Sequence, residues 1–307
     1  MKAISFDAHG PADVLRLVHV DPPVPGPGQV RIAVRSAGVN ALDHKIRSGA
    51  LRELFPVELP HVPGLEASGV VDAVGEDVTG VRAGDAVLGP TATGAYAEQA
   101  LAEAARLVVK PVSLSWEEAA ALPVAAETAW RGLAALGLRE GETLVVHGAA
   151  GGVGTLAVQF AVARGVDVVG TASEIHHSYL RELGAVPVTY GEGLAERVRA
   201  AAPGGVDAAF DVAGKGDAVA VSVELTGSPE RVVTIADPEG ARRRGAHFSS
   251  GGRAAPTVPA LTAALALHEA GTLRLPIHRV YPLAEAADAQ RASEHGHLAG
   301  KIVLTVG

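Results

Sequence analysis

TLVVHGAAGGVG, residues Thr143 to Gly154, is the stretch that decides the fold of this chain. Its apolar run, Leu144 to Val146, is typical of a parallel strand that is covered on both faces. Gly151 and Gly154 stand where a tight turn, a close pyrophosphate and close helix packing require the absence of a side chain. Ala149 takes the first glycine position of the G-x-G-x-x-G pattern. A strand, a glycine turn and a helix in this order predict a dinucleotide-binding unit.

The residues after the turn continue the same pattern. A helix from Thr155 to Arg164 would direct its positive N-terminal end toward the phosphates of a dinucleotide. Gly165 can end this helix, and Val166 to Ala172 then predicts the second strand of a right-handed βαβ unit. Strands and helices alternate as far as about Ile235, as expected of a doubly wound domain. The phosphate contacts are expected from the turn itself, at Ala150, Gly151, Gly152 and Val153.

Ser173 stands about 20 residues beyond the glycines, at the position that discriminates between the two nicotinamide dinucleotides. A carboxylate here binds the ribose 2′-hydroxyl of NAD and repels the 2′-phosphate of NADP, whereas Ser173 can donate a hydrogen bond to that phosphate. Glu174 would favour NAD if it turned inward. His176 and His177 offer only a pH-dependent positive charge. The alternative is a solvated helix start, with Ser173 as its N-cap and Glu174 in its first turn.

Composition and charge limit the class of protein. A chain of 307 residues with 48% hydrophobic and 20% charged residues is typical of a soluble globular protein with two domains. The net charge of -8 argues against broad nucleic-acid binding, which needs a basic face. No apolar stretch approaches the length of a membrane span, and the N-terminus lacks a signal-peptide core. We therefore expect a cytoplasmic protein with no membrane or nucleic-acid partner.

The chain contains no cysteine, which excludes disulfides, thiol catalysis and thiolate zinc sites. A zinc site built from histidine and carboxylate remains conceivable, and the one group worth weighing is His44, His61 and Glu66. Their spacing matches no compact ligand motif. The two histidines are instead expected to form local hydrogen bonds or to face solvent, and no metal site is predicted.

The rest of the chain predicts a second, β-rich domain and several helices. Short strand patterns separated by Pro and Gly predict a small, curled β domain between Met1 and Lys110. Trp116 to Leu136 predicts a helix, with Ser115 as its N-cap and a break or kink at Pro123. The remaining segments are the strands Val30–Arg35, Ala67–Val74 and Asp85–Leu88, the amphipathic helices Val258–Gly271 and Leu283–His295, and a closing strand Lys301–Val306.

Six blocks in the same order give the whole chain a family resemblance. They are residues 37–49 (AGVNALDHKIRSG), 63–71 (PGLEASGVV), 94–98 (GAYAE), 128–130 (TAW), the glycine turn, and 300–304 (GKIVL). In these blocks the chain resembles the zinc-independent quinone oxidoreductase branch of the medium-chain dehydrogenase/reductase superfamily, the branch that includes zeta-crystallin.

The resemblance implies an α/β protein with two domains. A GroES-like, β-rich catalytic domain would comprise residues 1–121 and 247–307, and a doubly wound Rossmann domain with a parallel sheet would comprise residues 122–246. It also implies NADPH-dependent reduction of a quinone or an α,β-unsaturated carbonyl compound in a homodimer. Hydride would pass directly to a small hydrophobic acceptor without a metal, so the protein's tasks are positioning, polarisation and exclusion of water.

The resemblance assigns two residues near the reaction. Asn40 matches an asparagine beside the nicotinamide, where its amide would bind cofactor or substrate; the alternative is a turn residue after Gly38. Lys45 matches a position held by tyrosine or lysine, where a cation could stabilise enolate charge or supply a proton. The alternative is a lysine on a surface strand. His44 stands where lysine-bearing relatives often have tryptophan, so the shape of the substrate pocket does not carry over.

Further cofactor contacts come from the same resemblance. Thr128 matches a threonine near the nicotinamide ribose, although it could simply bond within its helix. Tyr190 matches a tyrosine by the phosphate of the adenine ribose. The backbone at Ala213 and Ala236 would contact the nicotinamide ring or its carboxamide. Lys301 matches a lysine of the C-terminal strand, for which a structural salt bridge is an equal alternative.

NADP(H) is the expected cofactor, although one family feature is missing. Relatives commonly place arginine or lysine just after the residue equivalent to Ser173, and this chain has Ile175 nearby. We expect Ser173, Tyr190 and the histidines, His177 in particular, to take the place of that cation. Two other functions stay open: a tailoring enoyl reductase that acts on a polyketide-like or carrier-bound intermediate, and a non-catalytic NADPH-binding sensor or structural protein.

Overall fold

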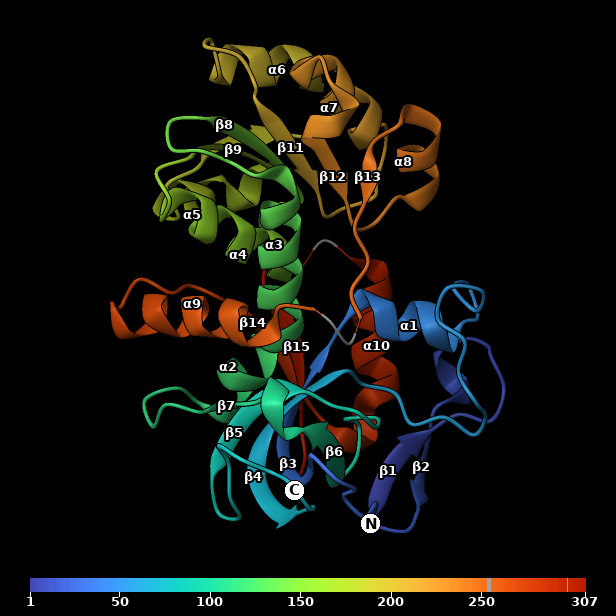
Figure 1. The fold of residues 1–307 in the computed structure, drawn as a ribbon. Coiled ribbons are helices and arrows are strands. Elements are labelled where there is room, and N and C mark those ends of the chain that lie inside the picture. Colours follow the sequence, from blue (N-terminus) through green and yellow to red (C-terminus); the bar gives the residue numbers. More distant parts are fainter. Residues whose placement is uncertain (253–254, 297) are drawn as a thin grey trace. The chain divides into compact units, whose positions relative to one another are not determined.

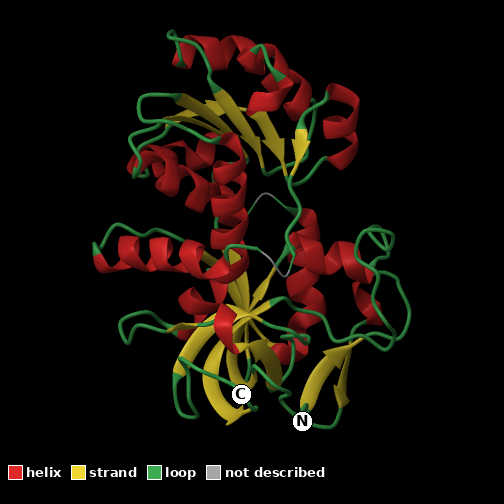
Figure 2. Cartoon of the chain, viewed as in Figure 1, coloured by secondary structure: helices red, strands yellow, loops and turns green. Residues whose placement is uncertain are grey.

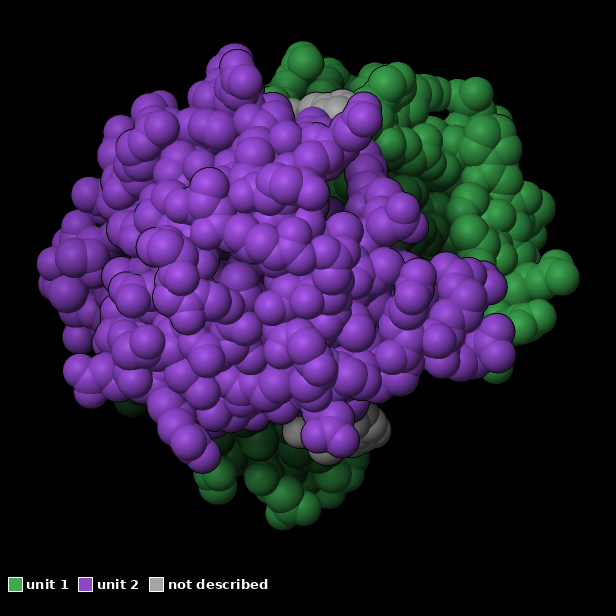
Figure 3. All heavy atoms as spheres, turned by 90° about the horizontal axis from the view of Figure 1, so that it is seen from above, with its two compact units in different colours: residues 1–124, 275–307 green, residues 125–274 purple. Residues whose placement is uncertain are grey.

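The structure is a computed structural model that describes residues 1–252, 255–296 and 298–307. The chain forms two compact units, which are drawn in different colours in Figure 3. Unit 1 consists of Met1–Val124 and Leu275–Gly307, and unit 2 of Ala125–Arg274. Among the described residues, no helix combines the length and the apolar character needed to cross a membrane.

Unit 1 is built on a seven-stranded sheet in the order β14-β15-β3-β4-β5-β7, with β6 also paired to β3. All pairs are antiparallel except β14 with β15. A separate hairpin joins β1 to β2. The strands are β1 (Lys2–Ser5), β2 (Arg16–His19), β3 (Gln29–Val39), β4 (Glu66–Val74), β5 (Ala86–Pro90), β6 (Gln99–Glu103), β7 (Val108–Val109), β14 (Ile277–Pro282) and β15 (Lys301–Thr305).

The core of unit 1 joins the two ends of the chain. Ile4 and Phe6 near the N-terminus are buried in one cluster with Ile302 and Leu304 of the closing strand. This cluster explains why the C-terminal segment completes the β-rich domain, because burial of apolar surface is the main stabilising term. The structure thus places Leu275–Gly307 in the same compact unit as Met1–Val124.

The described residues of unit 1 form three α-helices, and a fourth begins among them. They are α1 (Ala41–Arg47), α2 (Trp116–Ala121), α10 (Ala286–His295) and the first residues of α3 (Pro123–Leu136). Ser115 caps α2 as predicted: the Glu118 amide donates to Ser115 Oγ at 3.1 Å, and the Ser115 amide donates to Glu118 Oε2 at 2.9 Å. Pro123 separates α2 from α3, because proline lacks the amide that a continuous helix needs.

Unit 2 is a six-stranded parallel sheet in the order β10-β9-β8-β11-β12-β13. Figures 1 and 2 show helices on both sides of this sheet, as in a doubly wound fold. Its elements are β8 (Thr143–His147), α4 (Gly152–Val162), β9 (Asp167–Ala172), α5 (His177–Glu182), β10 (Val186–Thr189), α6 (Leu194–Ala201), β11 (Ala208–Asp211), α7 (Ala218–Thr226), β12 (Val232–Thr234), α8 (Pro238–Arg244), β13 (His247–Phe248) and α9 (Thr257–Glu269).

The second boundary between the units differs from the one expected after residue 246. The structure keeps residues up to Arg274 in unit 2, for two reasons. Strand β13 adds to the parallel sheet beside β12. The Gln159 side chain on α4 also donates to the Arg274 carbonyl and accepts from its amide, both at 2.7 Å.

The glycine turn has the geometry that its sequence predicts. Gly148 has a φ of +77°, and the Gly151 amide donates to its carbonyl at 3.1 Å. A Cβ on Gly154 would lie only 2.2 Å from the Gly148 carbonyl oxygen, so any side chain here would displace the backbone. Helix α4 begins at Gly152, earlier than the predicted Thr155, because the Thr155 amide already donates to the Gly151 carbonyl at 2.8 Å.

We predict that Gly154→Ala lowers the free energy of unfolding by about 1 to 3 kcal/mol, because its new methyl group overlaps the backbone. Gly151→Ala is the matched control: its Cβ would meet the same Gly148 oxygen at 3.5 Å, an ordinary contact, and its φ of -73° suits alanine. Urea unfolding monitored by tryptophan fluorescence measures both. Equal losses in the two variants would contradict the close approach at Gly154.

Candidate functional site

The predicted cofactor residues of unit 2 follow successive parallel strands. The glycine turn follows β8, and Ser173, Tyr190, Ala213 and Ala236 come after β9, β10, β11 and β12, respectively. Because all these strands run in the same direction, their carboxyl ends form one edge of the sheet. The strand order reverses between β8 and β11, which is where such sheets bind dinucleotides. The topology therefore brings these predicted residues to one edge.

The residues that would contact the 2′-hydroxyl or 2′-phosphate of the adenine ribose follow β9 and β10. Ser173 is the N-cap of a short 3-10 helix, Glu174–His176, but its side chain forms no capping hydrogen bond. Glu174 is exposed. His177 begins α5, and its Nε2 lies 3.5 Å from Thr189 Oγ1. The exposed fractions of Tyr190 and Ile175 are 48% and 79%, so both can be reached by a ligand.

Asp211, at the end of β11, organises the next part of this edge. Its Oδ1 accepts the amides of Ala213 and Gly214, both at 3.0 Å, and its Oδ2 accepts the Thr234 hydroxyl at 2.8 Å. Thr234 Oγ1 in turn accepts the Ala236 amide at 3.1 Å. The amides of Ala213 and Ala236 are thus engaged within unit 2.

Sequence reasoning missed the roles of Asp211 and Thr234, and a signal for them was present. Each is a polar residue that ends a buried strand pattern, in FDVAG and VTIAD. A third missed residue is His147, which is 2% exposed and ends β8; its Nε2 lies 2.9 Å from the buried Ser222 Oγ. Burial lowers the pKa of His147, so this ring is neutral at pH 7 and serves the packing of β8 against α7.

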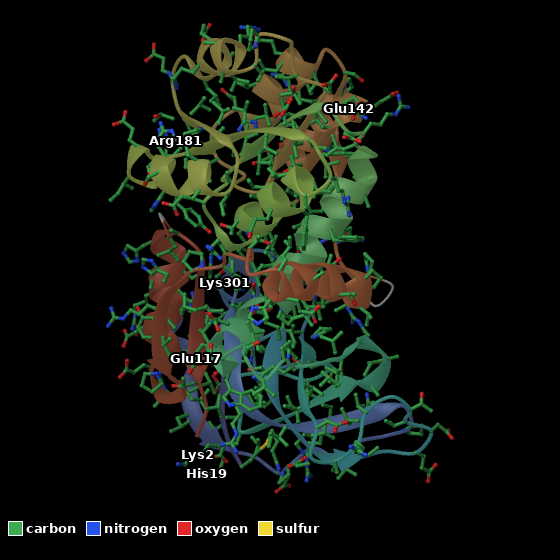
Figure 4. All side chains as sticks on the ribbon, turned by 90° about the vertical axis from the view of Figure 1, so that its left-hand side faces the viewer. Lys2, His19, Glu117, Glu142, Arg181 and Lys301 are labelled. Atoms are coloured by element: carbon green, nitrogen blue, oxygen red, sulfur yellow. The ribbon has the colours of Figure 1, made fainter. Side chains whose placement is uncertain are left out.

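In unit 1, Asn40 directly follows the central strand β3 and contacts two charged side chains. Its Nδ2 donates to Glu66 Oε1 at 2.8 Å, and its Oδ1 accepts from Lys301 Nζ at 2.6 Å. Lys301 Nζ also donates to Glu66 Oε1 at 2.7 Å and to the Val39 carbonyl at 3.3 Å. Lys301, labelled in Figure 4, therefore forms the salt bridge that was one of its two expected roles.

Asp43 completes this polar cluster and is fully buried on α1. Its Oδ2 accepts the Asn40 amide at 2.8 Å and the Tyr96 hydroxyl at 2.9 Å. Burial raises the pKa of Asp43 to about 7 and raises that of Tyr96 above its usual range. The hydrogen bonds and Lys301 lower the pKa of Asp43, and the nearby Glu66 raises it. Sequence reasoning missed both residues, although each lies in a block that carried the resemblance.

The other predicted residues lie in helices or do not cluster. Lys45 is half-buried on α1, so it is a helical residue and not one of a surface strand. Thr128 is buried on α3, where its hydroxyl lies 3.4 Å from Glu127 Oε2. Burial lowers the pKa values of His44 and His61. In the described part of the chain, no three His, Asp or Glu side chains are grouped as metal ligands.

We predict that Asp43 makes folding pH-dependent. Its pKa is higher in the folded protein than its ordinary 3.8, so its contribution to stability is complete below about pH 4 and is lost as the pH rises to about 7. Asp43→Asn mimics the protonated form and removes this loss. Between pH 4 and pH 8, the free energy of unfolding of the variant should therefore rise relative to that of wild type, on the order of a few kcal/mol. Urea unfolding across this range measures the difference, and a constant difference would contradict the raised pKa.

Comparisons with known proteins agree with this architecture. The family model of the alcohol dehydrogenase GroES-like domain matches residues 26–112, and that of the zinc-binding dehydrogenase matches residues 183–304. The rat synaptic vesicle membrane protein VAT-1 homolog is 33% identical, with 93% of this chain and 79% of that protein covered.

Two solved structures cover the chain almost completely. The quinone oxidoreductase from Coxiella burnetii has a TM-score of 0.87 at 32% identity, with 100% of this chain and 99% of that chain covered. A mycobacterial protein complexed with NADPH has a TM-score of 0.84 at 29% identity, with 99% and 100% covered. With its GroES-like and Rossmann domains, this chain belongs to the zinc-independent quinone oxidoreductase branch of the medium-chain dehydrogenase/reductase superfamily, a family of oxidoreductases that bind nicotinamide cofactors.

Proposed function

We propose that this protein is an NADPH-dependent reductase that delivers hydride directly to a quinone or an α,β-unsaturated carbonyl compound, and that it acts as a homodimer. The observation that carries the proposal is the carboxyl edge of the parallel sheet, where the glycine turn meets the reversal of strand order. The similarity to a quinone oxidoreductase and to an NADPH complex supports it.

The residues of unit 2 fit a dinucleotide. The turn holds its backbone so closely that a Cβ at Gly154 would overlap the Gly148 oxygen, and the N-terminal amides of α4 follow directly. Such a helix start binds phosphate through its amides and its dipole. We assign the pyrophosphate to Ala150, Gly151, Gly152 and Val153. We assign the nicotinamide half of the dinucleotide to Thr128 and to the backbone of Ala213 and Ala236.

Asn40 and Lys45 would act on the acceptor and the reduced ring. When bound, the nicotinamide supplies the hydride, and the acceptor then gains negative charge on its carbonyl oxygen. A quinone is itself a conjugated carbonyl compound, so one arrangement serves both acceptor classes. Lys45 can stabilise the charge that develops on the oxygen, and its ammonium group can donate the proton that completes the reduction to a hydroquinone or a saturated carbonyl compound.

We predict that NADPH absorbance at 340 nm decays when a naphthoquinone or an enone is added, and that kcat/KM is higher with NADPH than with NADH. NADPH should also raise the thermal midpoint of the protein, because it binds only the folded state. A clear preference for NADH would overturn the cofactor assignment. A thermal shift without turnover on a broad acceptor panel would favour the non-catalytic binder, and turnover of carrier-bound enoyl substrates alone would favour the tailoring reductase.

A second prediction concerns the cation that is missing beside Ser173. We propose that Ser173, His177 and Tyr190 bind the 2′-phosphate, and the exposed Ile175 leaves room for a stronger partner. Ile175→Arg should raise the preference for NADPH over NADH by about 10-fold or more, because a charge-assisted hydrogen bond is worth about 1.5 to 3 kcal/mol. Ile175→Gln controls for side-chain length without charge. The ratio of kcat/KM with NADPH to kcat/KM with NADH measures the effect. An unchanged ratio in Ile175→Arg would mean that the 2′-phosphate does not bind beside this residue.

A further inference from the structure

We infer that Glu66 and Lys301 are positioning residues that hold the amide of Asn40 in a single orientation. The inference rests on the proposed role of Asn40 at the nicotinamide, and it assigns to Lys301 an indirect role in place of direct contact with the cofactor.

The chemistry of the two charged groups dictates which way the amide points. A lysine ammonium group can only donate hydrogen bonds, so the Asn40 atom 2.6 Å from Lys301 Nζ must be the oxygen. A carboxylate that is paired with lysine can only accept, so the atom 2.8 Å from Glu66 Oε1 must be the nitrogen. A flipped amide would set oxygen against oxygen and nitrogen against nitrogen at these distances. Both contacts of the flipped amide would be repulsive.

The two clamping groups are themselves fixed. Lys301 Nζ has three acceptors, namely Val39 O, Asn40 Oδ1 and Glu66 Oε1, which match its three hydrogens. The ammonium group is therefore fully used within unit 1. Glu66 Oε2 accepts the Val124 amide at 2.7 Å. Glu66 and Lys301 are 0% and 6% exposed, so little solvent screens the pair.

The sheet brings the three residues together. Strand β3 ends at Val39, just before Asn40, and its two neighbours β4 and β15 begin with Glu66 and Lys301, respectively. Gly38 makes room for the carboxylate, because a Cβ at this position would lie 2.2 Å from Glu66 Oε1. The bond to Glu66 leaves one Nδ2 hydrogen of Asn40 for a ligand, in a direction that the charged pair fixes.

The clamp can be tested on the free protein, without cofactor or acceptor. The side-chain amide of Asn40 is assigned by NMR from the signal that Asn40→Ala removes. In the double variant Glu66→Gln/Lys301→Met, which leaves no unpaired buried charge, this signal should move and its hydrogens should exchange faster with water. Lys301→Arg keeps a charged donor, so the Asn40 signal should stay near its wild-type position and its hydrogens should exchange more slowly than in the double variant. An unchanged Asn40 signal in the double variant would overturn the clamp.

Kinetics test whether the clamp matters for the reaction. Glu66→Gln should lower kcat with NADPH and a quinone by about 10-fold or more, the range for loss of a hydrogen bond to a charged group, with a smaller change in KM. In an Asn40→Ala background the same substitution should have no further effect, because the group that it positions is absent. Glu294→Gln is the matched control: it removes the charge that pairs with the buried Arg47 elsewhere in unit 1.

The outcomes separate the clamp from the proposed function. Additive losses from Glu66→Gln and Asn40→Ala would mean that Glu66 acts independently of Asn40 and would overturn its positioning role. A loss equal to that of Glu294→Gln would mean that any broken ion pair of unit 1 has the same effect, which would also overturn it. Absence of turnover in wild type, with the Asn40 signal still dependent on Glu66 and Lys301, would refute the reductase and not the clamp.

Discussion

The buried carboxylate of Glu66 is the constraint on which much of unit 1 depends. A charge removed from water is tolerated only when it is paired and hydrogen-bonded, and here Lys301 supplies the charge while Asn40 and the Val124 amide supply hydrogen bonds. These partners come from the end of β3, the start of β15 and the start of α3. One buried charge thus ties a central strand to its C-terminal neighbour, although they are more than 200 residues apart in sequence.

Unit 2 meets a different constraint, because a parallel sheet collects the ends of its strands at one edge. The turn after β8 brings Gly154 close to the Gly148 carbonyl, and Asp211 with Thr234 holds the backbone after β11 and β12. Short polar side chains at strand ends therefore shape most of the predicted cofactor contacts. Under the proposed function, such contacts would bind the parts that NADP and NAD share, and discrimination between the two would fall to Ser173, His177 and Tyr190 after β9 and β10.

Local patterns predicted most elements correctly, and their failures share a cause. The strand at 144–146, the cap at Ser115 and the break at Pro123 depend on neighbours in sequence, and all three are confirmed. The early start of α4 and the boundary at Arg274 depend on contacts that a local pattern does not contain, such as the two hydrogen bonds between Gln159 and Arg274. Asp43 was missed for the same reason, since its partner Tyr96 lies 53 positions away.

The sequence by itself determined the parallel-sheet domain and its glycine turn, because apolar periodicity and glycine at tight approaches are local requirements. The family followed from the six blocks of sequence that resemble it. Only the tertiary structure decided that Lys301 donates a hydrogen bond to the side-chain oxygen of Asn40. From the sequence, Asn40 could have been a turn residue and Lys301 could have paired with any carboxylate. Strands β15 and β4 pair with β3 on its two sides, and their registers place both residues against Glu66. A hydrogen bond needs atoms within about 3 Å, and only the folded sheet sets that distance.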